Sequence, residues 1–177
     1  MVAPADHRRV AEQVTESCDL AGDPRTLRLE VLDLLAQVVP YDAYAWLLTD
    51  PETAVGGSPI ADVPCLPRLP ELIRLKYLTE VNRWTNMRGS VARLREVTAG
   101  DLSQSKMWAE LLVQFDVGDI VSTVFADTHG CWAFLDLWRI GEQPAFTDQE
   151  QELLVTIAEI VTPALRRLQA SPEGRAE

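Results

Sequence analysis

The sequence is poor in the residues that build metal, disulfide and acid–base sites. It has three cysteines, Cys18, Cys65 and Cys131, widely spaced and odd in number, and only two histidines. These spacings fit neither a metal site nor a disulfide framework, so we expect no metal, no cofactor and a reducing compartment. Gly-rich phosphate loops and nucleophile elbows are also missing from the sequence. We therefore predict that this chain is not an enzyme.

Long apolar runs and a basic charge balance are absent as well. No run approaches the ~18 residues of a membrane span, and the first residues hold no hydrophobic signal region. Sixteen basic against 27 acidic residues give a net charge of −11, which repels phosphate backbones and anionic lipids. We expect a cytoplasmic protein that binds neither nucleic acid nor membrane through this segment. We predict one domain over residues 1–170 and a linker-like tail over residues 171–177.

Residues 117–140 are the densest β-type run of the sequence, rich in Val, Ile, Thr, Phe and Trp. In the middle, Asp127-Thr128-His129-Gly130 suits a type I turn, with Gly130 in the left-handed conformation of a bulge. The pattern predicts a hairpin that pairs residues 120–126 with residues 131–138. In this register Ser122 lies opposite Asp136, whereas a two-residue turn would place Val121 there.

Two of the predicted strands sort their side chains by size. In the second strand of the hairpin, the bulky face carries Trp132, Phe134, Asp136 and Trp138. Residues 43–49 repeat the pattern, with Tyr44, Trp46 and Leu48 on one face. We predict that both strands belong to one sheet, with their aromatic residues on the same face. Asp136 interrupts this face, so it needs a partner or a wet cavity if it is buried.

Apolar stripes predict helices on both sides of these strands. They fall at residues 6–20, 24–38 and 69–84, after Ser103 or Ser105, and at 147–168. The stripe of the third is formed by Ile73, Tyr77, Val81 and Trp84. Thr147 and Glu150 form a capping box, and Pro163 predicts a kink. A loop is expected at 56–59, and weak strands are expected at 60–66 and 91–94. This order indicates an α+β fold with a central antiparallel sheet.

Several stretches carry a resemblance to a known family. They are SKMWAELLVQFDVGD, VFADTHGCWAFLDLWR, FTDQEQELL, TPALRR and, earlier in the chain, PYDAYAWLLTD. Over residues 24–168 the chain resembles the amino-terminal GAF-like sensor domain of actinobacterial LuxR-type transcriptional regulators. The resemblance implies terminal helices on one face of the sheet, commonly used for dimerisation, and a roofed small-molecule pocket on the other. A carboxy-terminal helix-turn-helix binds DNA in that family, and residues 1–177 are expected to correspond to the sensor part alone.

Applied to this chain, the resemblance places a pocket roof at residues 65–84 and 105–115. An aromatic-lined site with one polar anchor is the usual form of a small-ligand pocket. The predicted ligand-binding residues are Tyr44, Trp46, Tyr77, Trp84, Trp108, Trp132, Phe134 and Asp136. The plainer interpretation is that the aromatic residues are packed core and that Asp136 pairs with an Arg or with backbone. His129 is expected to be a solvated turn residue, and Asp116 and Asp119 are expected to lie on a solvated face.

Two main hypotheses follow, with a weaker third. The chain is either a small-molecule-sensing module that controls an attached DNA-binding domain, or a structural homodimerisation module with a filled core and no ligand. In both cases we expect a homodimer through the terminal helices. The third is a GAF-type reductase that acts through Cys65 or Cys131. A cavity lined by Trp46, Trp132 and Asp136 would favour sensing.

Overall fold

The computed structural model describes residues 4–170. The tail predicted at residues 171–177 lies outside the described residues. The helices are α1 (Pro4–Leu20), α2 (Pro24–Leu35), α3 (Leu69–Leu78), α4 (Leu94–Val97), α5 (Lys106–Glu110) and α6 (Asp148–Ala170). The strands are β1 (Ala43–Thr49), β2 (Gly56–Asp62), β3 (Val91–Arg93), β4 (Val117–Asp127) and β5 (Gly130–Ile140). Short 3-10 turns, η1 (Leu66–Arg68), η2 (Trp84–Asn86), η3 (Leu102–Gln104) and η4 (Leu112–Phe115), join them.

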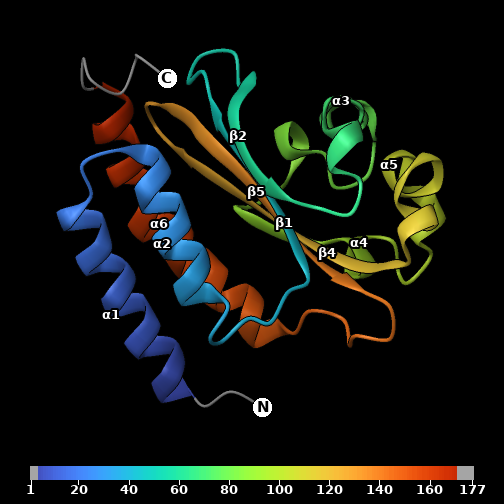
Figure 1. Cartoon of the computed structure of the whole chain (residues 1–177), viewed down its shortest axis with the longest axis horizontal. Helices are drawn as coiled ribbons and strands as arrows, with labels where there is room; N and C mark the ends of the chain where they lie inside the picture. The colour runs from blue at the N-terminus through green and yellow to red at the C-terminus, as the bar shows by residue number, and fades with distance from the viewer. Residues whose placement is uncertain (1–3, 171–177) are drawn as a thin grey trace.

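The five strands form one antiparallel sheet in the order β2-β1-β5-β4-β3 (Figure 1). This confirms the predicted α+β class and the central antiparallel sheet. β5 lies in the middle, as its two apolar faces require. β2 is an edge strand and begins at Gly56, so Gly56 and Gly57 of the predicted loop are paired with β1 instead, while Ser58 and Pro59 fall where the register shifts. Pro59 is tolerated there because an edge strand has hydrogen-bonding positions that face away from the sheet.

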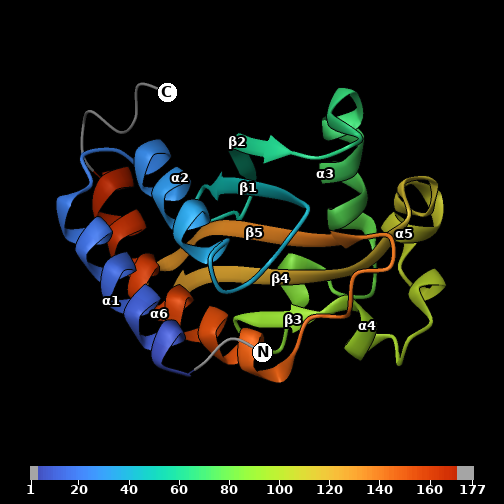
Figure 2. The ribbon, with the colours of Figure 1, turned by 60° about the horizontal axis from the view of Figure 1, so that its bottom comes forward.

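The helices divide into two layers, one on each face of the sheet (Figure 2). α1, α2 and α6 cover one face, as predicted, and their buried residues form one core cluster with Trp46, Leu135 and Leu137 of the sheet. We call this face the terminal-helix face. α3, α4 and α5 lie over the other face, the roofed face, where a second core cluster joins them to the sheet. The central sheet therefore separates two independent interiors.

Local capping explains where two of the helices begin. Asp23 accepts a hydrogen bond from the backbone N–H of Thr26 at 2.8 Å, and Pro24 occupies the first turn of α2. At α6, the N–H of Thr147 donates to Glu150 Oε2 at 2.7 Å, while the N–H of Glu150 donates to Thr147 Oγ1 at 3.2 Å. This is the predicted capping box. α3 ends at Leu78, earlier than predicted, because Thr79 has an extended backbone.

The β4–β5 hairpin has the expected register at its centre but a different bulge. Ser122 lies opposite Asp136, as predicted, and Phe125 lies opposite Ala133. The register then shifts, because Ala126 lies opposite Cys131 and leaves Trp132 as the extra residue. The bulge is therefore at Trp132 and not at Gly130. An extra residue reverses the alternation of side chains, so Trp132 packs in the terminal-helix core with Trp46 rather than beside Phe134.

The prediction that β1 and β5 share an aromatic face is wrong. Trp46 lies opposite Leu135, and Tyr44 lies opposite Leu137. Trp46 therefore points to the terminal-helix face, where its ring stacks on Phe125 with 5.0 Å between centroids. Size sorting shows that each strand has a bulky and a slim face, but a shift of one residue decides which faces meet. Here the slim face of β1 lies beside the bulky face of β5.

Candidate functional site

The roofed face holds a buried ion pair at the centre of the sheet. Asp136 comes from β5, Ser122 comes from the neighbouring β4, and Lys76 descends from α3 above them. Lys76 Nζ lies 3.1 Å from Asp136 Oδ2 and donates to Ser122 Oγ at 2.7 Å. Lys76 is 1% exposed and Asp136 is 3% exposed. Buried charges are rare in proteins unless they are paired, and this pair is also hydrogen-bonded.

Aromatic rings enclose this ion pair on one side. Trp84, in η2, donates its indole N–H to Asp136 Oδ1 at 2.9 Å. Its ring stacks on Phe134 with centroids 4.8 Å apart and planes 6° apart. The ammonium of Lys76 lies 5.2 Å from the centre of the Trp84 ring, within the range of a cation–π contact. Tyr77 meets both rings edge-on. The aromatic wall and the charged pair are therefore one unit.

Two polar atoms on this face are buried without a partner. Asn82 donates from Nδ2 to Ser122 Oγ at 3.2 Å, but its Oδ1 accepts nothing from the described residues. Asn82 has φ of +55°, a left-handed conformation that Asn tolerates better than most residues. Trp138 Nε1 likewise has no acceptor between residues 4 and 170. Buried polar atoms without a partner are uncommon in folded proteins, so both atoms need a structural or functional explanation.

Burial sets the electrostatics of the pair. Removal of Lys76 from water lowers the pKa of its ammonium group, and the carboxylate of Asp136 works against this shift. Burial and the attraction of Asp136 thus act in opposite directions on the same ammonium group. Loss of either partner leaves an isolated charge in the interior, which is strongly unfavourable.

The structure brings together half of the predicted ligand-binding residues. Tyr77, Trp84, Phe134 and Asp136 meet on the roofed face, as described above. Tyr44, Trp46 and Trp132 do not join them, because they lie on the terminal-helix face. Trp108 is also under the roof, but its indole N–H donates to the carbonyl of Val117 at 2.8 Å, away from Asp136.

Sequence reasoning missed Lys76 and Asn82. The buried face of α3 consists of Leu72, Leu75 and Lys76, one residue away from the predicted stripe of Ile73 and Tyr77. A lysine four residues after a buried leucine was the available signal, because positions i and i+4 share a helix face. Nothing in the sequence singles out Asn82, whose role depends on an irregular turn after α3.

Other candidate groups have structural partners. Asp119 was expected on a solvated face, but it is 1% exposed and accepts from the backbone N–H groups of Arg95, Ile120 and Phe146. It ties β4 to α4 and to the segment before α6. His129 is exposed at the hairpin turn, as predicted. Among the described residues, no group of His, Cys, Asp or Glu could hold a metal ion.

The thiols carry no sign of activation. Burial raises the pKa of Cys18 to about 11, and it also raises the pKa of Cys65 and of Cys131. A reactive cysteine has a lowered pKa, since the thiolate is the nucleophile. These three residues are free cysteines that pack as small apolar side chains.

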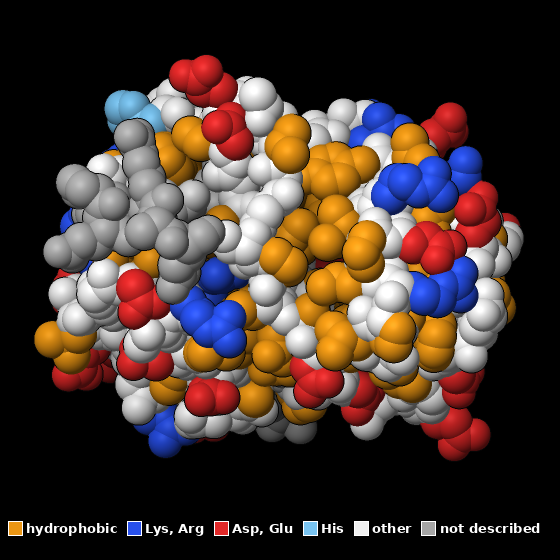
Figure 3. Space-filling view, turned by 45° about the horizontal axis from the view of Figure 1, so that its top comes forward, with side chains coloured by type: hydrophobic (Ala, Val, Ile, Leu, Met, Phe, Trp, Pro, Cys, Tyr) orange, Lys and Arg blue, Asp and Glu red, His pale blue; other side chains and the backbone are white. Residues whose placement is uncertain are grey.

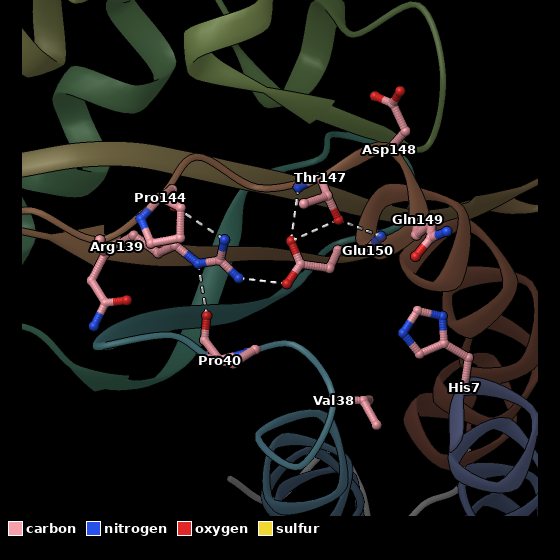
Figure 4. A pocket seen from close by; sticks show the side chains of 10 residues that line it. His7, Val38, Pro40, Arg139, Pro144, Thr147, Asp148, Gln149 and Glu150 are labelled. Atoms are coloured by element: carbon pink, nitrogen blue, oxygen red, sulfur yellow. Dashed lines mark hydrogen bonds and ion pairs between the residues drawn. The ribbon is translucent and has the colours of Figure 1, made fainter. Parts of the chain in front are cut away.

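A cavity of about 500 Å³ lies elsewhere, where the start of α6 meets α1 (Figure 4). Arg139 lines it and donates to the carbonyls of Pro40, Pro144 and Ala145 and, at 2.6 Å, to Glu150 Oε1. Its guanidinium therefore already binds the segment that precedes α6, rather than reaching into the cavity for a ligand. We assign Arg139 itself a structural role, while His7, which lines the same cavity, has a buried Nε2 without a partner among the described residues.

The outer surface of the roof is apolar in places. Figure 3 shows hydrophobic side chains gathered around α3 and the segment that joins it to β2. Leu66 is 50% exposed and Leu78 is 46% exposed. Within residues 4–170, no helix has the length and apolar character to cross a membrane.

Comparisons with known proteins agree with this architecture. No protein-family model matches the sequence, and no curated protein matches it. Among solved structures, the N-acylhomoserine lactone dependent LuxR-family transcription factor CepR2 of Burkholderia cenocepacia is similar, with a TM-score of 0.65 and 12% identity over 94% of this chain and 99% of that chain. Escherichia coli SdiA has a TM-score of 0.63 and 15% identity, over 91% of this chain and 68% of its own.

A GAF domain is similar to the same extent. The GAF domain of a phosphoenolpyruvate-protein phosphotransferase from Coxiella burnetii has a TM-score of 0.62 and 13% identity, over 94% of this chain and 96% of that chain. At these identities the likeness concerns the fold. The chain is thus a GAF-like α+β domain, with the fold that LuxR-family regulators and GAF domains share.

Proposed function

We propose that this chain is a small-molecule-sensing regulatory module whose ligand binds on the roofed face at Asp136. The observation that carries the proposal is the buried Lys76–Asp136 pair with the partnerless Asn82 Oδ1 beside it. A core selected for stability alone gains little from such a pair, because apolar residues of the same volume are often as stable or more so. Perturbed, buried polar groups gather instead at functional sites.

The structure also offers a route from this site to the terminal helices. β5 carries Asp136 at its centre and Trp132 near its start. The carbonyl of Trp132 accepts from Gln169 Nε2 of α6 at 2.9 Å. At the hairpin tip, Asp127 accepts from Trp132 Nε1 at 3.1 Å and from Arg166 at 2.6 Å. A ligand that shifts β5 would therefore bias the end of α6, where an output domain would follow.

The output we propose is transcriptional control by an attached DNA-binding domain. CepR2, with the same fold, is a transcription factor that depends on N-acylhomoserine lactone. The acidic segment itself, with a net charge of −11, is unsuited to contact DNA.

Binding to freshly purified protein tests the proposal. Native mass spectrometry should find a retained small molecule, and that molecule should raise the melting temperature of the apo protein. Asp136→Asn should lose the rise, whereas Asp19→Asn, on the exposed side of α1, should keep it. If compounds stabilise both variants as they stabilise the wild type, binding occurs elsewhere and the proposed site is wrong.

A second function is favoured by the tight packing on the roofed face. Trp84, Phe134 and Lys76 fill the space around Asp136, as a structural dimerisation module without a ligand would require. In that case no compound is retained after purification, and Asp136→Asn changes only stability. We propose no catalytic activity for either function. A double variant, Cys65→Ser with Cys131→Ser, should keep every activity of the wild type, which would exclude a cysteine-dependent reductase.

We also propose a homodimer formed through the terminal helices. Leu20 is 76% exposed and Leu29 is 37% exposed on α1 and α2, and these side chains support the proposal. The apolar stripe of α6 contributes little to this dimer interface, because Leu154, Ile157 and Leu165 pack in the core of their own chain. Light scattering at tens of micromolar protein should give twice the monomer mass. The variant Leu20→Asp should have a lower average mass at the same concentration. A monomer mass for the wild type would contradict the proposal.

A further inference from the structure

The ammonium group of Lys76 is held by three groups of complementary chemistry. Asp136 supplies a carboxylate at 3.1 Å, Ser122 supplies a hydroxyl at 2.7 Å, and Trp84 supplies the face of its ring at 5.2 Å. We call these three residues the ammonium cage. A carboxylate and an aromatic face are the groups with which proteins recognise organic cations.

Lys76 fills this cage, so a ligand can reach Asp136 only if one of the surrounding side chains moves away. Trp84 and Phe134 are stacked on each other, and Asp136 and Ser122 are fixed on the two central strands. Lys76 is different, because its ammonium ends a flexible four-carbon stem and it comes from α3, which also carries the 46% exposed Leu78. Lys76 is therefore the side chain that we take to move.

Charge then limits what can replace Lys76. An uncharged or anionic ligand would leave the carboxylate of Asp136 buried without a counter-charge, which is strongly unfavourable. A ligand ammonium exchanges one positive charge for another and keeps the pair intact. The partnerless Asn82 Oδ1, beside Ser122, would accept a further donor of the same ligand. We propose that the roofed site recognises small molecules with a primary ammonium group, and that Lys76 occupies the ammonium cage until such a ligand displaces it.

This inference rests on the proposed sensing function and is tested first with a variant. Lys76→Ala removes three carbons and the ammonium, which n-propylammonium replaces. We expect saturable stabilisation of Lys76→Ala by n-propylammonium chloride and not by n-propanol, read as a melting temperature. In the double variant Lys76→Ala with Asp136→Asn, the affinity for n-propylammonium should fall by about a hundredfold, as for the loss of a buried charged partner. Equal binding of propanol, or equal affinity in the double variant, would overturn the inference.

The wild type offers an independent test, because the chain has only two lysines. Lys76 is buried, whereas the side chain of Lys106 is 51% exposed. Acylation with an amine-reactive ester should label Lys106 and spare Lys76. With n-hexylammonium present, the ratio of Lys76 to Lys106 labelling should rise to a plateau, while n-hexanol should leave it unchanged. Lys106 serves as the internal standard for reagent consumed by the amine.

The proposed sensing function and the proposed displacement of Lys76 are contradicted by different results. A flat labelling ratio with n-hexylammonium would overturn displacement of Lys76, even if Lys76→Ala does not fold. Sensing would still stand if an uncharged compound stabilises the wild type but not Asp136→Asn. If no compound binds the wild type and the ratio stays flat, both fail.

Discussion

The ion pair under the roof makes a sharp prediction for the variant Lys76→Met. Methionine nearly preserves the volume of the side chain but removes the ammonium, so Asp136, only 3% exposed, loses its counter-charge and keeps Trp84 as its remaining donor. Loss of one partner of a buried pair costs about 3–5 kcal/mol. Because the indole hydrogen bond remains, we expect the lower end, about 3 kcal/mol. This is a large share of the ~5–15 kcal/mol that stabilises a typical domain.

The double variant Lys76→Met with Asp136→Asn removes both charges and keeps an oxygen for the indole N–H. It should recover to within about 1 kcal/mol of the wild type, since uncharged replacements of a buried pair are often neutral. The coupling free energy of the cycle is then at least ~2 kcal/mol. Urea unfolding followed by tryptophan fluorescence measures all of these values.

Lys106→Met is the matched control, because Lys106 is exposed and its pair with Glu110 is a loose one at 3.7 Å. It should stay within about 0.5 kcal/mol of the wild type. If Lys76→Met is as stable as Lys106→Met, or if the double variant loses the sum of the two single losses, the pair does not compensate for burial as argued.

Three further predictions concern other parts of the fold. Burial raises the pKa of Cys18 from 9.0 to about 11 in the native state. Ionisation of this thiol in the unfolded chain should therefore remove roughly 2 kcal/mol of stability as pH rises from about 9 to about 11. Urea unfolding at both pH values should show a smaller loss for Cys18→Ala. Asp119→Asn, which leaves one carbonyl oxygen for three backbone donors, should cost about 2–3 kcal/mol, and an unchanged urea midpoint would contradict the assignment of Asp119 as a tie. Thr147→Ala should cost about 1 kcal/mol through the lost cap of α6, with Thr156→Ala, which is exposed in the middle of the same helix, as the comparison.

Local sequence patterns predicted the helices and strands better than they predicted which side chains meet in the core. The strand at residues 43–49, the capping box before α6 and the pairing of Ser122 with Asp136 are as expected, because turn and cap chemistry act over a few residues. The bulge at Trp132 was not expected, since Gly130 seemed the better site, and it moved an indole to the other face. The bulky face of the first strand was assigned to the wrong side of the sheet for a related reason. Alternation shows which side chains share a face, but it does not show which side of the sheet that face covers.

The site was predicted in part. Asp136 was recognised as a polar anchor within an apolar strand, and it needs a partner, as expected. That partner is Lys76 rather than an arginine or backbone group, and it comes from 60 residues earlier in the chain. Contacts of this range depend on where α3 crosses the sheet, and a single sequence does not encode that distance in any readable pattern.

The central position of β5 has an evolutionary consequence. Phe134 and Asp136 belong to one interior, while Ala133, Leu135 and Leu137 belong to the other. Between residues 133 and 137, selection can therefore alter the odd and the even positions of β5 almost separately. Descendants of such a chain can acquire new chemical preferences at residues 134 and 136 while the terminal-helix layer is inherited unchanged.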